Sequence, residues 1–462
     1  MPDMVRSVGL LPALVWGVLA GFLRPRGPIF PLEAVGIIVV SVVVGVVAGR
    51  VTRSRWAMFF APIFFVVAGE VTRIGFTGPT VDLPRLSTLG QAALVSGRGA
   101  YALLTVLPMV VGAAYGAGST RRSRSWLRWV GRFCTGILAL VVAAITVVVA
   151  VPGRAAPIGG GISELAYAGK LGLMIRGNRA DAPLLLFVPG SPGGSELGAM
   201  RRRLGALEQQ FVVATMDRRG GGRSFGGLDP TPTFTVENET ANVVQAAKYL
   251  LSRFRKDKLY LVAHSGGTIG ATLAVQDQPA LFAAYVGVGQ VAAPAASDRG
   301  QYDDTLARAR EKGDDALVNR LTAVGPPPYD DIYGYEPMIL AEDVVYGSGN
   351  GAALEDNVEA PELSALDKVH VISGLLDSFD AYYPRVQEID FRNQVPALGV
   401  PVWFVAGERE VPARTRDLNQ WFQVLQAPRK EVVTLAGAGH RSMFDQPAAF
   451  VELMSRVVVA AP

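Results

Sequence analysis

A serine stands between an apolar run and a set of small residues in the stretch LYLVAHSGGTIG, residues 259–270. This is Ser265, with Ala263 and Gly267 two positions away on either side. A serine on a sharp strand-to-helix turn needs such small neighbours, because the strained turn leaves no room for larger side chains. The following helix N-terminus favours negative charge on the serine oxygen. The pattern predicts Ser265 as a nucleophile, with the Gly266 N–H as one donor to the oxyanion.

The chain has three histidines, and their places favour one of them as a general base. His264 adjoins the serine, where the turn points it away from the nucleophile, and His370 lies outside the regular alternation of strands and helices. His440 stands in the loop GAGHRS after the last expected strand, from which a base reaches back to the serine. We therefore predict that His440 is the base.

A carboxylate must orient the imidazole and stabilise its cation. The run GERE follows the strand expected at residues 402–406, and Glu410 within it fits the chain order serine, acid, histidine. Glu408 on the same loop and Asp298 after the preceding strand remain alternatives. The predicted set is therefore a Ser-His-Glu triad.

Two further loops follow expected strands. The loop VPGSPGG brings backbone N–H groups close to a substrate carbonyl, so the Ser191 N–H is the second predicted oxyanion donor. The loop DRRGGGRS, residues 217–224, is interpreted as a structural turn beneath the site, with Asp217 and Arg219 in structural roles.

The framework for these groups is an alternation, from Ser163 onward, of short Val-, Leu- and Phe-rich runs with longer amphipathic stretches. This alternation is typical of a mostly parallel sheet covered by helices, whose ligands bind outside the carboxyl ends of the strands. Residues 291–391 interrupt it, being richer in charge, Tyr and Pro, and are expected to form a helical lid between core segments 162–290 and 392–462. The expected central strands are residues 184–188, 211–216, 259–263, 284–288, 402–406 and 431–435.

The N-terminal region, residues 1–152, holds most of the excess of apolar residues, which make up 50% of the chain. A helix of roughly 20 apolar residues crosses a bilayer. A Pro/Gly-rich linker, residues 153–161, separates this region from the rest. We predict an all-α transmembrane region of five helices, or four on a stricter count, at about residues 8–23, 29–49, 56–71, 100–117 and 133–151.

Arginines set the expected orientation, because positively charged loops stay cytoplasmic. The last helix would then carry the following domain to the outer face of the cell membrane. A cleaved signal peptide is the competing interpretation of residues 8–23, but further long apolar runs follow it. The arginines concerned are Arg50, Arg53 and Arg55 after the second span, and Arg121, Arg122, Arg124, Arg128 and Arg132 before the last.

The net charge and the cysteine content limit which kinds of partner and metal site are expected. The net charge of +4 comes mostly from those arginines, so the expected partners are a lipid bilayer and a small-molecule or peptide substrate, and no nucleic acid. Cys134 is the single cysteine, which excludes an intrachain disulfide and a cysteine-based metal site. No cofactor and no metal are expected, and the oligomeric state stays open.

The loops PGSPGG, DRRGGGRS, AHSGG, GERE and GAGH, in this order, resemble the α/β-hydrolase superfamily and most closely its proline iminopeptidase group. The resemblance covers roughly residues 162–459 and implies an α/β-hydrolase fold with a helical lid. This sequence departs from the group at Pro189, where the group has His, at Ala263, which replaces the first glycine of the serine motif, and at Glu410, which replaces Asp. In that group lid carboxylates bind the free amine of the substrate, and the resemblance offers Glu336, Glu342 and Asp343 as counterparts.

The expected chemistry is acyl transfer to water through an acyl-enzyme, on an ester or a small peptide or amide. A carboxylesterase- or lipase-like hydrolase is one alternative. Another is a catalytically silent membrane receptor or scaffold on the same fold. The serine in the turn argues against epoxide or haloalkane hydrolysis, in which an Asp would occupy that place.

Overall fold

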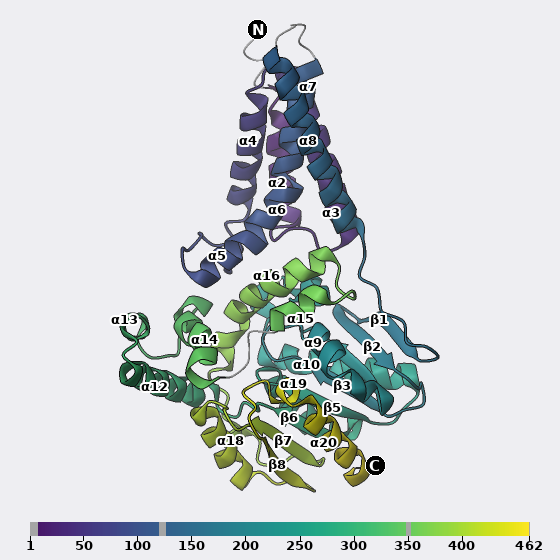
Figure 1. Ribbon diagram of the computed structural model, residues 1–462, viewed down its shortest axis with the longest axis vertical. Coiled ribbons are helices and arrows are strands. Elements are labelled where there is room, and N and C mark those ends of the chain that lie inside the picture. Colours follow the sequence, from purple (N-terminus) through teal and green to yellow (C-terminus); the bar gives the residue numbers. More distant parts are fainter. Residues whose placement is uncertain (1–7, 120–125, 348–352, 462) are drawn as a thin grey trace. The chain divides into compact units, whose positions relative to one another are not determined.

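The computed structural model describes residues 8–119, 126–347 and 353–461 (Figure 1). The chain divides into two compact units. One is helical and comprises Met1–Gly153 with Ser364–Val369, and the other comprises Arg154–Leu363 and His370–Pro462. Arg121, Arg122 and Arg124, on which the expected orientation partly depends, lie outside the described residues.

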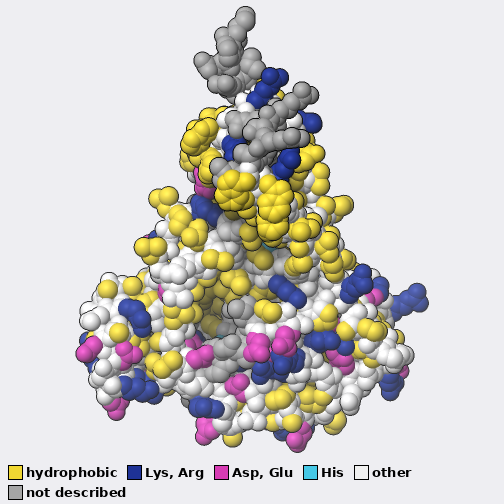
Figure 2. Space-filling model, turned by 45° about the horizontal axis from the view of Figure 1, so that its top comes forward, with side chains coloured by type: hydrophobic (Ala, Val, Ile, Leu, Met, Phe, Trp, Pro, Cys, Tyr) yellow, Lys and Arg dark blue, Asp and Glu magenta, His cyan; other side chains and the backbone are white. Residues whose placement is uncertain are grey.

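The helical unit is built from apolar helices that approach one another through small residues. A Cβ on Gly45 would collide with the carbonyl oxygen of Met109, and one on Gly112 with that of Val42, so helices α3 and α7 pack backbone to backbone. Large hydrophobic side chains remain on the outside, as Figure 2 shows in yellow. The helices are α2 (Leu11–Leu23), α3 (Pro31–Thr52), α4 (Ala57–Thr72), α5 (Thr88–Leu94), α6 (Ala100–Leu104), α7 (Val106–Ser119) and α8 (Trp126–Ala150).

Within the described residues, three helical stretches are long and apolar enough to cross a bilayer, namely Pro31–Thr52, Thr88–Ser119 and Trp129–Ala150. The first and third predicted spans correspond to shorter apolar helices, α2 and α4, of 13 and 16 residues. The helical stretch that contains the fourth predicted span starts 12 residues before it, at Thr88, and is capped by the Ser87 hydroxyl. Its first turns contain Arg98 and small residues, so an apolar run alone does not reveal them.

An eight-stranded sheet forms the centre of the second unit, in the order β1-β2-β4-β3-β5-β6-β7-β8. Strands β3 to β8 pair in parallel, whereas β1 pairs with β2 and β2 with β4 in antiparallel fashion. All six predicted strands are present, with ends shifted by up to two residues, and the β1–β2 hairpin is additional. The strands are β1 (Ile162–Ala168), β2 (Leu171–Gly177), β3 (Leu184–Val188), β4 (Val212–Met216), β5 (Leu259–His264), β6 (Phe282–Val288), β7 (Val402–Gly407) and β8 (Lys430–Leu435).

Helices cover both faces of this sheet. Phe450, Leu453 and Val457 of α20 (Pro447–Ala460) belong to one apolar core with Phe187 of β3 and Val286 of β6. Helix α9 (Leu197–Arg203) contributes to the same core. Helices α10 (Val236–Phe254) and α11 (Gly267–Asp277) pack together and against the central strands. The doubly covered sheet explains why its central strands are continuous apolar runs.

Helices fill the segment between β6 and β7, green in Figure 1. Gly374 of the last long one lies so close to the core that a Cβ there would collide with the carbonyl oxygen of Gly220. The helices are α12 (Pro294–Lys312), α13 (Asp315–Val324), α14 (Ile332–Tyr346), α15 (Ala353–Glu359), α16 (Ala365–Tyr382) and α17 (Phe391–Gln394).

Candidate active site

Ser265 lies on a strained turn between β5 and α11. Its φ angle is +47°, in the left-handed region that non-glycine residues rarely adopt. The turn is fixed by the Ser265 N–H, which donates to the carbonyl oxygen of Val288 at 2.8 Å. A Cβ on Gly267 would collide with the Pro189 carbonyl oxygen, which explains the glycine there. The turn leaves the Ser265 side chain partly exposed, ahead of the helix N-terminus.

Three side chains from separate loops form one chain of hydrogen bonds. His440 Nε2 lies 2.8 Å from Ser265 Oγ, and His440 Nδ1 lies 2.6 Å from Glu410 Oε2. His440 and Glu410 are both buried. Because β5, β7 and β8 run parallel, the loops that follow them meet at the same edge of the sheet. The structure thus joins the three residues that the sequence predicts as a triad.

The second oxygen of Glu410 is also held, by the Val411 N–H at 2.9 Å and Arg414 Nη1 at 3.2 Å. Burial alone would raise the pKa of Glu410, but the charge and hydrogen bond of His440, with the charge of Arg414, outweigh it and hold that pKa at about 2. Glu410 is therefore ionised and fixed at both oxygens.

The alternative acids have other partners. Glu408 is exposed and accepts a hydrogen bond from the Gly437 N–H at 2.7 Å. Asp298 is buried and accepts hydrogen bonds from Tyr383 Oη at 2.9 Å and Gln387 Nε2 at 3.2 Å. Burial raises the pKa of Asp298 to about 6, although the bond from Tyr383 opposes the shift. Of these three carboxylates, Glu410 is the one that the structure shows hydrogen-bonded to His440.

The loop after β3 lies directly against the serine turn. A Cβ on Gly190 would lie 3.0 Å from Ser265 Cβ, and one on Gly266 would lie 2.9 Å from the Gly190 carbonyl oxygen. Buried Arg218, paired with Glu239 at 2.9 Å, donates to that same oxygen at 2.9 Å. Since a trans peptide points its C=O and the next N–H in opposite directions, fixing the Gly190 carbonyl also fixes the direction of the Ser191 N–H.

The neighbouring loop supports this arrangement. A Cβ on Gly221 would collide with the Gly193 carbonyl oxygen, so the two loops touch through their backbones. Asp217 accepts a hydrogen bond from the Arg223 N–H at 2.9 Å, and Arg219 Nη1 donates to the Thr233 carbonyl oxygen at 2.7 Å. These contacts fit the structural roles expected for Asp217 and Arg219.

Sequence reasoning missed a second histidine–carboxylate pair beside the triad. His264 Nδ1 lies 3.0 Å from both oxygens of Glu196, which also accepts a hydrogen bond from the Gly190 N–H at 3.1 Å. Burial would raise the pKa of Glu196, but the charge of His264 and its hydrogen bond lower it to about 2. Glu196 lies 68 residues from His264, and no local pattern links them. The available signal was His264 itself, next to the serine but pointing elsewhere.

The lid carboxylates differ in their surroundings. Glu336, Glu342 and Asp343 all lie on α14, where the first two are buried and Asp343 is partly exposed. Glu342 is paired with Arg414 at 2.8 Å and accepts a hydrogen bond from Gln301 Nε2 at 3.0 Å. Its charge is thus matched within the protein, unlike that of a carboxylate kept for a substrate amine.

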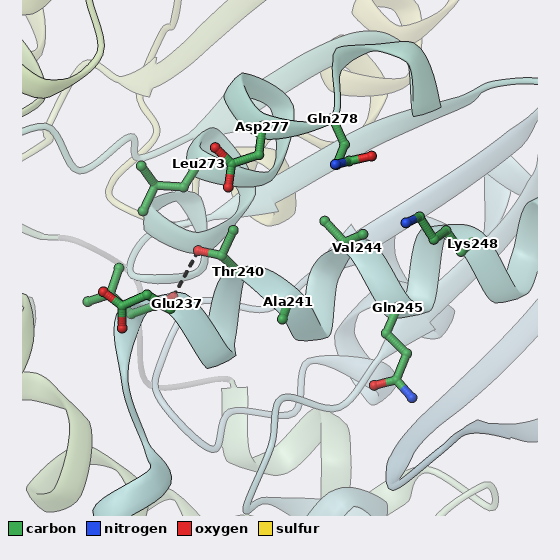
Figure 3. Close-up of a pocket in the computed structure, with 10 residues that line it drawn as sticks. Glu237, Thr240, Ala241, Val244, Gln245, Lys248, Leu273, Asp277 and Gln278 are labelled. Carbon is green, nitrogen blue, oxygen red and sulfur yellow. Dashed lines mark hydrogen bonds between the residues drawn. The ribbon is translucent and has the colours of Figure 1, made fainter.

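A separate surface hollow of about 700 Å³ lies between α10 and α11 (Figure 3). Val244 and Leu273 form its apolar part, and Glu237, Lys248 and Asp277 lie around it. Its lining includes no member of the hydrogen-bonded chain at Ser265, so the hollow does not form part of the candidate site.

Comparisons with known proteins relate most of this unit to hydrolases. The model of the Alpha/beta hydrolase family matches residues 185–453, a range that includes Ser265, Glu410 and His440. The probable aminopeptidase YbaC of Bacillus subtilis (strain 168) is 27% identical over 290 residues, which cover 62% of this chain and 91% of that protein.

Solved structures give similar matches. A proline iminopeptidase-related protein from Thermus thermophilus is 19% identical, with a TM-score of 0.47, and the match covers 65% of this chain and 98% of that one. The proline iminopeptidase of Mycobacterium smegmatis is 15% identical, with a TM-score of 0.46, and the match covers 65% of this chain and all of that one, 100%.

Proposed function

This chain belongs to the alpha/beta hydrolase family, and we propose that it is a serine hydrolase with Ser265 as its nucleophile. The observation that carries the proposal is the unbroken set of hydrogen bonds from Ser265 Oγ through the His440 ring to Glu410. An ordinary glycine-rich turn has no need of a buried imidazole and carboxylate aligned in this way.

The geometry supports acyl transfer in two halves. His440 Nε2 takes the proton as Ser265 Oγ attacks the substrate carbonyl carbon, and the Ser191 and Gly266 N–H groups bind the resulting oxyanion. The imidazolium then gives its proton to the leaving group, which forms the acyl-enzyme. A water molecule, deprotonated by His440, releases the acid and restores the hydroxyl of Ser265. Glu410 stays ionised throughout and stabilises the imidazolium.

We propose an ester or a small peptide or amide as the substrate. The similarity to a probable aminopeptidase favours the peptide or amide class. Two features favour a carboxylesterase-like specificity instead: Pro189 stands where the iminopeptidase group has His, and Arg414 already neutralises Glu342. Initial rates on p-nitrophenyl esters and on proline and alanine arylamides separate the two classes.

Labelling with a fluorophosphonate tests the nucleophile directly. We expect the purified full chain to form a covalent adduct that peptide mass spectrometry locates on Ser265, because the reagent requires an activated serine. Heat-denatured protein and Ser265→Ala protein are the controls and should stay unlabelled. Folded wild-type protein without an adduct would favour a silent receptor or scaffold on this fold.

We further propose that the N-terminal helices anchor the protein in the cell membrane with the hydrolase unit extracytoplasmic. The support is the apolar surface of these helices and the arginines at Arg50, Arg53 and Arg55.

A reporter enzyme that is active only outside the cytoplasm is expected to be active when fused after Pro462. The same reporter fused after Ser54, in the loop expected to be cytoplasmic, should be inactive. Protection of the C-terminal domain from added protease in intact spheroplasts would contradict this orientation.

A further inference from the structure

Arg414 links the lid helices to the carboxylate that faces His440. From α18 (Pro412–Val424) it donates to Glu410 Oε1 at 3.2 Å, to Glu342 Oε1 and Oε2 at 3.0 and 2.8 Å, and to Gln301 Oε1 at 3.0 Å. Gln301 closes the ring by donating to Glu342 Oε2 at 3.0 Å. Gln301 and Glu342 lie on α12 and α14, so both lid helices reach the same guanidinium.

Carboxylates outnumber guanidinium groups in this cluster. One arginine lies between two buried carboxylates, Glu342 and Glu410, and the second of these also faces His440. Burial would raise the pKa of Glu342, but the charge and hydrogen bonds of Arg414 outweigh it and lower that pKa. The charges of Glu342 and Glu410 in turn outweigh the effect of burial on Arg414 and raise its pKa. All three groups therefore carry their charges at neutral pH.

We propose that Arg414 and Glu342 are positioning residues for the proposed triad: Arg414 holds Glu410 against His440, and Glu342 holds Arg414 and moderates its positive charge. The inference rests on the proposed function, since it concerns the basicity of His440 during turnover. Through Arg414, which belongs to α18, the lid helices α12 and α14 would affect the basicity of His440.

Other ionisable groups lie around His440 and Arg414 and must stay constant in a test. From β5, the His264 ring lies 5.2 Å from the His440 ring, centroid to centroid, and is paired with Glu196. Arg441 follows His440 in its own loop and lies 3.6 Å from Glu196. On the lid side, Asp298 of α12 is buried, and the charge of Arg414 acts on it. Substituting only Arg414 or Glu342, with uncharged side chains of similar size, leaves these groups in place.

The pH profile of kcat/KM for p-nitrophenyl acetate, measured with the full chain in detergent or nanodiscs, tests the proposal. Its acidic limb reports deprotonation of the essential base in the free enzyme. Glu342→Gln leaves the Arg414 charge uncompensated beside Glu410, which disfavours the imidazolium, so the limb should move to lower pH by about one unit. Arg414→Gln removes a positive charge, so the limb should move to higher pH. It should also lower kcat, because Glu410 loses the hydrogen bond from Arg414.

Conservative and matched variants separate this role from a general loss of structure. Arg414→Lys keeps the charge and should keep the limb near its wild-type position. The double variant Arg414→Gln/Glu342→Gln removes both charges and should return the limb toward that position. Arg176→Gln removes a comparably buried arginine, paired with Glu208 at 2.7 Å, and should leave the limb unchanged.

The proposal is overturned if Glu342→Gln does not move the limb to lower pH, or if the two single variants move it in the same direction. If Arg414→Gln does not fold, Glu342→Gln and Arg414→Lys still decide. Failure of the proposed function looks different, because wild-type protein would then show no turnover dependent on Ser265 and no fluorophosphonate adduct.

Discussion

Ser265→Ala is expected to lower kcat by about three decades or more, on whichever ester or amide proves to be a substrate. Ser265 Oγ, which lies 2.8 Å from His440 Nε2, is the atom that would form the acyl bond, and alanine has no replacement for it. His440→Ala should cost a similar factor, because the two residues act as a unit. The measurement is kcat on purified full chain, against wild type prepared in parallel.

Two controls make this result interpretable. Thermal unfolding of Ser265→Ala should match wild type closely, since the substitution removes one partly exposed oxygen. The double variant Ser265→Ala/His440→Ala should lose about as much as either single variant, and not the product of the two losses. Retained turnover in Ser265→Ala would show that the nucleophile is another group.

Glu410→Gln is expected to keep the fold but to cost up to about four decades in kcat. The glutamine amide can donate a hydrogen to His440 Nδ1, which favours the tautomer with Nε2 protonated and therefore unable to accept the Ser265 proton. It also removes the negative charge that stabilises the imidazolium. Steady-state kinetics with circular dichroism of the variant separate this effect from unfolding.

Matched carboxylates supply the controls for Glu410. Glu408→Gln changes an exposed carboxylate two residues from Glu410, and Asp298→Asn changes a buried carboxylate that is hydrogen-bonded to Tyr383. Both variants should lose little turnover. Glu410→Asp keeps the charge but shortens the reach by one methylene, so a partial loss is expected. Full activity in Glu410→Gln would place the triad acid elsewhere.

The fold was largely predictable because its central strands are continuous apolar runs. The family match and the parallel order of β3 to β8 confirm the predicted α/β-hydrolase fold. The β1–β2 hairpin was missed for a physical reason. Strand β1 is an edge strand whose side chains are mostly partly exposed, and Tyr167 is exposed, so it carries no apolar run. Strand β2 is buried along its length, but two glycines and Arg176 interrupt its apolar residues.

The candidate site was predictable where its residues are recognisable from the local sequence. The small residues of its own turn indicate Ser265, and the loop after the last strand indicates His440. The pairing of Glu342 with Arg414 was not predictable, because the two residues are 72 positions apart and no periodicity connects them. The resemblance offered Glu342 as a ligand for a substrate amine. The structure pairs it with Arg414, a partner that the sequence alone does not indicate. A role for Glu336, Glu342 and Asp343 in substrate binding stays a prediction.

The glycine contacts between α16 and the core limit how this protein could be redesigned. Gly374 rests on the backbone of Gly220, and Gly221 rests on that of Gly193 in the loop before α9. Exchanging residues 291–391 for the lid of a relative, a common route to new specificity, would place a foreign side chain against these loops unless the incoming helix also has glycine at that point. Chimaeras should therefore keep α16 with the recipient core, and an exchanged segment from α12 to α14 should retain Gln301 and Glu342, which hold Arg414.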